Sequence, residues 1–170
     1  MTLGSHALGI TFFTVNEMKT LIEKIKLDQG LACIPKMKNN GILIVGYGYN
    51  LVENPAEMNK KEVDRIRRSH IGVDRAEEIL TDSLIKYSVD LGCELPFIKK
   101  LNNVRKFALL RMVYDLGSVE QFLQFDQMTA KLCSRDFQLA SDYILITGWA
   151  RQSPEIAKEV VQQILTGTIE

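Results

Sequence analysis

The sequence predicts a mostly helical α+β fold, and three observations support this prediction. Capping signals and apolar residues at helical spacing recur through most of the 170 residues. An Asn-Gly pair at 40–41 lies between two apolar runs, which is the strongest short-range signal for a β-hairpin. Apolar residues make up 46% of the chain and charged residues 25%, as in ordinary globular domains. This composition excludes a disordered chain, a collagen-like repeat and a dedicated coiled coil.

The first predicted helix begins after Thr14, and residues 1–13 are expected to form a flexible leader. Thr14 and Glu17 have the spacing of a capping box, in which each side chain accepts a backbone N–H of the other residue. Gly30 is expected to end the helix. The apolar face of this helix consists of Met18, Leu21, Ile22 and Ile25.

A hairpin of two strands is predicted next, at 31–38 and 42–50. Pro35 has no N–H to donate, so the first strand is expected at an edge of the sheet. The glycines of the second strand leave one of its faces bare. A ligand or another backbone can approach such a face, or the glycines mark a bend, and the sequence leaves both possibilities open. The alternating residues are Gly46, Tyr47, Gly48 and Tyr49.

A short charged helix is predicted over 60–69. Its basic residues suggest phosphate binding, but Glu62 and Asp64 lie among them, which favours a solvated helix face. The basic run consists of Arg65, Arg67 and Arg68.

Helices account for the rest of the chain. A long helix is predicted over 74–91, with Gly92 as its C-cap, and an almost wholly apolar helix over 104–116. Two or three short helices are expected between 118 and 147. Ser153 is predicted to cap a last helix that has Pro154 at its first position.

Three stretches together resemble the phage-type lysozymes, glycoside hydrolase family 24. In family members these stretches appear as a D-E-G helix end with a G-x-G-H strand, an R-x-A-L helix with a later glycine, and a W-x-x-Q-x-P segment. Their order and spacing agree over 14–168. The stretches are 27–31 with 45–49, 104–117, and 148–154 with 157–158 and 166–168.

The resemblance implies a two-lobed lysozyme-like fold within a single domain at 14–170. A small β lobe is expected at 29–73 and a connecting helix at 74–91. The helical lobe would comprise 14–28 and 92–170.

The catalytic signature of that family is absent from the matching positions. The family has a Glu, then an Asp after eight residues, then a Thr after five more. This chain has Gln29, Lys38 and Ile44 at the same spacings. The strand His of the family corresponds to Tyr49, and an Arg of its last helix falls at about Ile156.

These replacements remove the chemistry of glycoside hydrolysis, which needs a carboxylic acid and a carboxylate. Gln29 has no proton to give at neutral pH, so a general-acid contribution of roughly 10²–10⁴-fold is lost. Lys38 puts positive charge where an oxocarbenium-like centre needs negative charge, which at about 5 Å costs on the order of several kcal/mol. Ile44 cannot orient a water. We therefore expect no catalytic residue at these three positions.

Three functions remain open. The expected one is a catalytically inactive pseudo-muramidase that binds a protein partner or peptidoglycan glycan. The alternative is a residual or altered muramidase, an endolysin-type peptidoglycan hydrolase that uses a relocated carboxylate such as Asp115. The third is a purely structural component. The candidate binding residues in the groove that the resemblance implies are Gly46, Tyr47, Gly48, Tyr49 and Asp115.

The charge balance favours a protein partner over the anionic cell wall. Lys and Arg number 21, as do Asp and Glu, so the net charge is zero. Proteins that bind nucleic acid or an acidic wall usually carry surplus positive charge. We expect no nucleic acid as partner and no membrane span, because no apolar run approaches the roughly 20 residues needed.

No metal or cofactor is expected, and synthesis is predicted in the cytoplasm of a bacterial or phage-infected cell. The start of the chain lacks a basic segment followed by an apolar core, so no signal peptide is expected. The three cysteines have no metal-type spacing and are expected to be free thiols of a reducing compartment. They are Cys33, Cys93 and Cys133.

Overall fold

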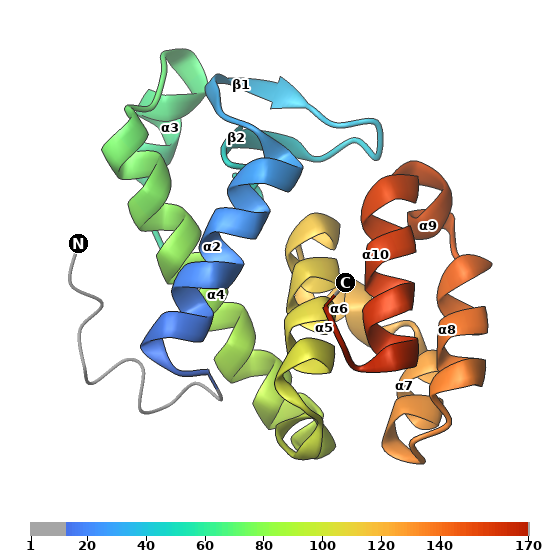
Figure 1. The fold of residues 1–170 in the computed structure, drawn as a ribbon. Helices are drawn as coiled ribbons and strands as arrows, with labels where there is room; N and C mark the ends of the chain where they lie inside the picture. Colours follow the sequence, from blue (N-terminus) through green and yellow to red (C-terminus); the bar gives the residue numbers. More distant parts are fainter. Residues whose placement is uncertain (1–12, 170) are drawn as a thin grey trace. The chain divides into compact units, whose positions relative to one another are not determined.

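Helices dominate the structure, and a small antiparallel sheet lies in the N-terminal half of the chain (Figure 1). The computed structural model describes residues 13–169, so all of the predicted leader except Phe13 lies outside the described residues. The chain divides into two units, Met1–Val89 and Asp90–Glu170. The element content confirms the prediction of a mostly helical α+β fold.

Helix α2 (Val15–Gln29) of the first unit begins at the predicted capping box. The Glu17 N–H donates to Thr14 Oγ1 at 3.3 Å, and the Thr14 N–H donates to Glu17 Oε2 at 2.7 Å. Gly30 ends the helix with a φ of +64°, which a residue without Cβ adopts at little cost. Both predicted ends of this helix are confirmed.

The sheet consists of β1 (Ala32–Met37), β2 (Leu43–Gly46) and β3 (Tyr49–Asn50), antiparallel and in the order β1-β2-β3. The predicted hairpin turn closes through the Gly41 N–H, which donates to the Lys38 carbonyl at 2.9 Å. The sequence prediction of a hairpin with an edge strand around Pro35 is confirmed.

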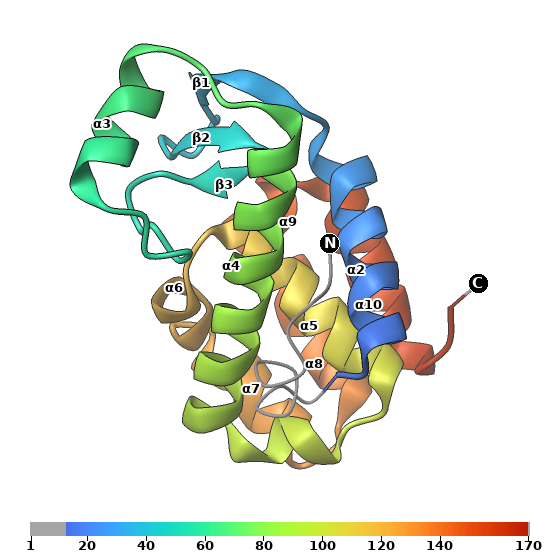
Figure 2. The same ribbon diagram turned by 90° about the vertical axis from the view of Figure 1, so that its left-hand side faces the viewer.

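Two helices complete the first unit: α3 (Lys60–Arg68) and α4 (Val73–Glu94), which continues five residues beyond it. Helix α3 lies beside the sheet and contacts β1 (Figure 2). The core of the unit lies between these elements. It consists of Val45, Tyr49, Leu51, Met58, Val63, Ile66, Ile71, Ala76 and Ile79.

The prediction that Gly92 ends the long helix is wrong, because α4 continues through it to Glu94. The residue before Pro96 is Leu95, with a φ of −127° and a ψ of 75°. A proline disfavours the helical conformation of the residue that precedes it. The helix therefore stops at the proline, and the glycine is tolerated inside it.

The second unit is built from helices around α5. In chain order they are η1 (Pro96–Lys100), α5 (Asn103–Leu116), α6 (Val119–Leu123), α7 (Asp126–Cys133), α8 (Phe137–Leu145), α9 (Gly148–Gln152) and α10 (Pro154–Thr166). Every residue from 106 to 116 on α5 is buried. Helix α10 packs against both α5 and α8. The expected central apolar helix and the short helices after it are confirmed.

Arg105 connects the start of α5 to the end of α10 by hydrogen bonding. Its Nε donates to the Ile164 carbonyl at 2.8 Å, and its guanidinium lies 3.6 Å from the centre of the Phe137 ring. Burial lowers the pKa of this guanidinium from its usual value. Among the described residues, no helix is long and apolar enough to cross a membrane.

Candidate functional site

Gln29, where the resemblance implied a catalytic acid, is the last residue of α2. Its side chain is half-buried and lies directly over the turn between β2 and β3. A Cβ added at Gly48 would come within 2.6 Å of Gln29 Oε1. The structure therefore places an amide against the backbone of this turn, and an amide has no acidic proton to give.

Lys38 and Ile44, the two other positions of the signature, lie on the hairpin. Lys38 opens the turn that closes the hairpin, and its N–H donates to the Ile42 carbonyl at 2.9 Å. Ile44 lies in β2 opposite Lys36 and Asn50, and only 4% of it is exposed. Ile44 thus contributes an apolar core side chain, and the three positions provide no carboxylate.

The carboxylates nearest in sequence are engaged locally or lie outside the hairpin. Lys24 Nζ lies 3.4 Å from Asp28 Oδ1, one helical turn away. Glu53 is exposed in the turn after β3. Neither Asp28 nor Glu53 therefore substitutes for the acid that is missing at position 29.

The two glycines of the hairpin mark a bend, which decides between the possibilities that the sequence left open. Gly46, the last residue of β2, and Gly48, in the turn that separates β2 from β3, have φ values of +61° and +78°. Both also lie under helices of the same unit, because a Cβ at Gly46 would meet Ala76 Cβ at 3.1 Å. The bare face of the predicted strand is therefore covered by α2 and α4.

Tyr49, one of the candidate binding residues, is a core residue with 1% of its surface exposed. Its hydroxyl donates to Asn54 Oδ1 at 2.6 Å and accepts the Ala56 N–H at 3.2 Å. Burial raises the pKa of Tyr49 to about 12. The ring and hydroxyl are used within the first unit, so Tyr49 offers no surface to a ligand.

The sequence did not predict a cluster of charged side chains around Lys26. Lys26 Nζ lies 2.6 Å from Glu77 Oε1 and 3.1 Å from Glu23 Oε1, and 5.5 Å from the centre of the Tyr47 ring. The hydrogen bond to Glu77 raises the pKa of Lys26. The three-residue spacing between Glu23 and Lys26 was the only local signal for this cluster. Glu77 lies on α4, and only the fold brings it to this side of α2.

Asp115, the candidate for a relocated acid, is buried in the second unit with 5% of its surface exposed. Its Oδ2 accepts Trp149 Nε1–H at 2.8 Å and the Ser153 hydroxyl at 2.6 Å. It joins the end of α5 to α9 and the start of α10. Two short hydrogen bonds to a buried carboxylate are typical of a structural group.

The prediction that Ser153 is the N-cap residue of α10, with Pro154 at the first position, is confirmed. The Ser153 side chain makes no cap hydrogen bond, and its hydroxyl donates to Asp115. Ile156 is half-buried on α10. Within residues 13–169, no group of three or more His, Cys, Asp or Glu side chains could hold a metal ion.

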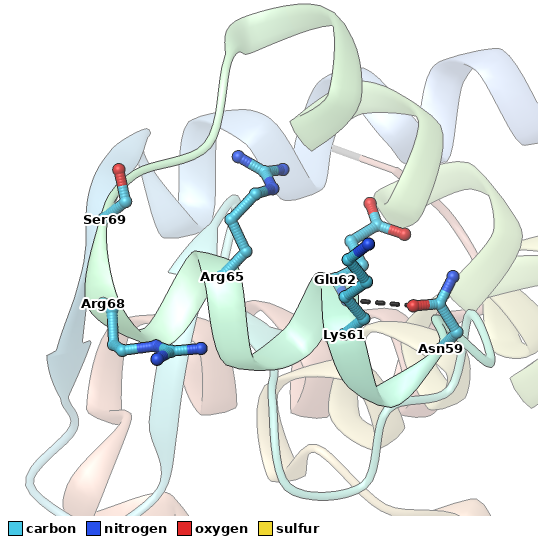
Figure 3. A pocket seen from close by; sticks show the side chains of 6 residues that line it. All are labelled: Asn59, Lys61, Glu62, Arg65, Arg68 and Ser69. Atoms are coloured by element: carbon cyan, nitrogen blue, oxygen red, sulfur yellow. Dashed lines mark hydrogen bonds between the residues drawn. The ribbon is translucent and has the colours of Figure 1, made fainter.

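An open hollow of about 520 Å³ lies along α3 (Figure 3). Three of the side chains that line it are basic and one is acidic. Asn59, the N-cap residue of α3, also lines it. The Asn59 side chain accepts the Glu62 N–H at 2.9 Å. The lining residues are Asn59, Lys61, Glu62, Arg65, Arg68 and Ser69.

In comparisons with known proteins, the chain matches no family model and no curated protein.

Proposed function

We propose that this chain is a catalytically inactive, lysozyme-like protein that acts as an interaction module. The observation behind the proposal is the placement of Gln29, whose amide lies against Gly48 at the position of the expected acid. Lys38 and Ile44 complete a set without a carboxylate. An acid and a carboxylate are the minimum for this hydrolysis, so binding is the function that the residues support best.

The partner that we favour is a protein, with peptidoglycan glycan as the other candidate. The net charge of zero provides no long-range attraction for an anionic wall. Co-sedimentation with purified peptidoglycan sacculi separates the two. We expect the chain to stay in the supernatant, and its recovery in the pellet would establish the glycan as ligand.

A zymogram tests the absence of hydrolysis. We expect an overloaded lane to produce no clearing of peptidoglycan between about pH 4 and about pH 8, where carboxylate acids and bases are poised. Clearing would support the alternative of a residual muramidase. In that case the variant Asp115→Asn would identify the acid, because an amide cannot donate the proton. The burial of Asp115 and its bonds to Trp149 and Ser153 argue against this role.

Restoring the three residues of the signature tests whether their replacement alone accounts for the absence of hydrolysis. The triple variant Gln29→Glu, Lys38→Asp and Ile44→Thr returns the acid, the carboxylate and the hydroxyl. Ile44 is buried, so its replacement by Thr alone is expected to cost about 1–3 kcal/mol of stability. The single variant Ile44→Thr is therefore the matched control for folding. Lysis by a folded triple variant would show that the site was silenced by these three residues.

A further inference from the structure

The basic side of α3 is unusual for a chain without net charge. Residues 60–70 contain five Lys or Arg side chains and two acidic ones, whereas the whole chain contains equal numbers. Three of the basic residues recur at positions i, i+4 and i+7, so they lie on one side of the helix. These are Lys61, Arg65 and Arg68, and all three are exposed and line the hollow in Figure 3.

The single acidic side chain of the hollow is already neutralised by a cation from another helix. Arg75 of α4 donates to Glu62 through Nε at 2.8 Å and through Nη2 at 3.2 Å, a two-pronged contact. The hydrogen bond to Glu62 raises the pKa of Arg75. Glu62 was one of the two acidic residues, with Asp64, that favoured a solvated helix face, and its contact with Arg75 removes it as a partner for the basic side.

The cations of the hollow have no acidic partner in the part of the chain that the structure describes. Lys61 and Arg65 form no ion pair there, and Arg68 donates only to the backbone carbonyl of Asp64, at 3.0 Å. In Figure 3 the Arg65 side chain extends away from α3, while the Ser69 hydroxyl lies 3.0 Å from His70 Nδ1. The hollow therefore offers several donors to an anion.

We propose that this basic side of α3 binds an acidic segment of a partner protein. Positions 61 to 68 span about 10 Å of helix, at 1.5 Å per residue. Carboxylates at alternate positions of an extended segment recur about every 6.6–6.8 Å, so two of them fit this length. Arg presents a planar pair of donors that matches a carboxylate. The inference rests on the proposed function as an interaction module and specifies its surface and the chemistry of its partner.

Nucleic acid fits this surface less well. Binding of single strands uses aromatic side chains on which bases stack, and none of the six lining residues is aromatic. Tight duplex binding uses about 6–10 phosphate contacts, and the hollow provides three cations on a chain with zero net charge. Charge complementarity at short range therefore favours a short acidic protein segment.

The test measures binding of a fluorescent peptide of six alternating Glu and Gly residues by anisotropy at low salt. The variant Lys61→Gln, Arg65→Gln and Arg68→Gln is expected to bind about tenfold more weakly, because three exposed ion pairs are lost. The matched control carries the same charge change at exposed sites elsewhere: Lys99→Gln, Lys100→Gln and Lys158→Gln. The control is expected to bind within about twofold of the unsubstituted chain.

Folding and the competing ligands are checked in the same experiment. Thermal melts followed by circular dichroism establish that both triple variants are folded, and Arg65→Lys with Arg68→Lys, which keeps the charge, should retain most of the binding. Absence of peptide binding, equal loss in the two triple variants, or tighter α3-dependent binding of an oligothymidylate would overturn the proposal. Clearing in the zymogram would remove the proposed function alone and leave the result at α3 unaffected.

Discussion

The Asp115 carboxylate uses one oxygen to accept two hydrogen bonds from residues 34 and 38 positions further along the chain. The donors belong to Trp149, which is buried, and Ser153, which is half-buried. A lost partner leaves the buried Trp149 N–H without a hydrogen bond and without water, and this desolvation cost exceeds the net value of one hydrogen bond. Residues of this kind contribute to stability even though they lie at positions that suggest chemistry.

Replacement of Asp115 by Ala is expected to lower the free energy of unfolding by about 2–4 kcal/mol. Ser153→Ala should cost about 1.5–3 kcal/mol, and the double variant less than the sum, because both changes remove the same hydrogen bond. Urea denaturation measures all three. The control is Asp142→Ala, whose carboxylate is exposed and accepts from Gln138, with an expected change within about 0.5 kcal/mol. Equal costs at 115 and 142 would contradict the structural role.

Tyr49 predicts how stability changes at alkaline pH. Its pKa is raised to about 12 in the folded chain, whereas an unfolded tyrosine titrates near 10. The unfolded state therefore releases its proton first, so this contribution is complete below about pH 10 and is lost as the pH rises to about 12. The loss amounts to about 2–3 kcal/mol, at about 1.4 kcal/mol per pH unit.

Comparison with Tyr49→Phe isolates this contribution. The variant should be about 1 kcal/mol less stable at pH 7, because its ring cannot donate to Asn54, and should show a shallower decline between pH 10 and 12. Denaturant unfolding at stepped pH measures both effects. Tyr143→Phe removes one tyrosine from a half-buried site and is the control. An unchanged alkaline decline in Tyr49→Phe would refute the assignment.

At the scale of elements, the end of α2 and the turn between β2 and β3 depend on each other. Gly48 needs its positive φ of +78°, and the Gln29 side chain fills the space beside it. Gly41, in the hairpin turn, has a φ of +81° and open space around it. Substitutions at Gly41 and Gly48 therefore separate the cost of backbone strain, which both share, from the cost of a clash with a neighbouring side chain, which only Gly48 has.

Gly41→Ala should cost only the backbone strain, about 1–2 kcal/mol. Gly48→Ala should cost about 1 kcal/mol more, because its Cβ displaces the Gln29 amide. Adding Gln29→Ala to Gly48→Ala should recover part of that difference, and chemical denaturation measures each step. Equal costs for Gly41→Ala and Gly48→Ala would contradict the described contact.

Local signals predicted most of the elements. The capping box at Thr14, the Asn-Gly turn and the glycine caps depend on residues a few positions apart, so the sequence alone reveals them. One error concerned the choice between two nearby residues: Gly92 is tolerated inside α4, which ends only before Pro96. Local signals also miss contacts with distant residues, such as the hydrogen bond from the Ser153 hydroxyl to a carboxylate 38 positions earlier.

The candidate site was predictable only in part, for the same reason. The resemblance to the lysozymes directed attention to Gln29, Lys38 and Ile44, and the chemistry of these side chains predicted that they provide no acid. The sequence could not show that Tyr49 is buried or that Glu62 is bound to Arg75, thirteen residues further on. Burial and ion pairs between helices follow from packing and leave no pattern in a single segment.

At the scale of the whole molecule, the cysteines provide a check on the described surface. All three are free, as the odd number and the spacing predicted, and the structure shows that all three are exposed. We expect all three thiols to react with Ellman's reagent without denaturant, at the stoichiometry found for the unfolded chain. Each single replacement by Ser, at Cys33, Cys93 or Cys133, should lower the number of reactive thiols by one. A native chain that reacts with fewer thiols than the unfolded chain would contradict this surface.

The concentration of basic residues on α3, in a chain whose charges sum to zero, has a consequence for the kinetics of association. At physiological ionic strength, charges on the surface are screened beyond about 8 Å, so an approaching acidic segment meets no attraction until it nearly touches the helix. Encounters then occur at the ordinary unsteered rate of about 10⁵–10⁶ M⁻¹s⁻¹. Differences in affinity among partners would therefore arise in the time for which each stays bound, and loss of Arg65 or Arg68 would shorten that residence time.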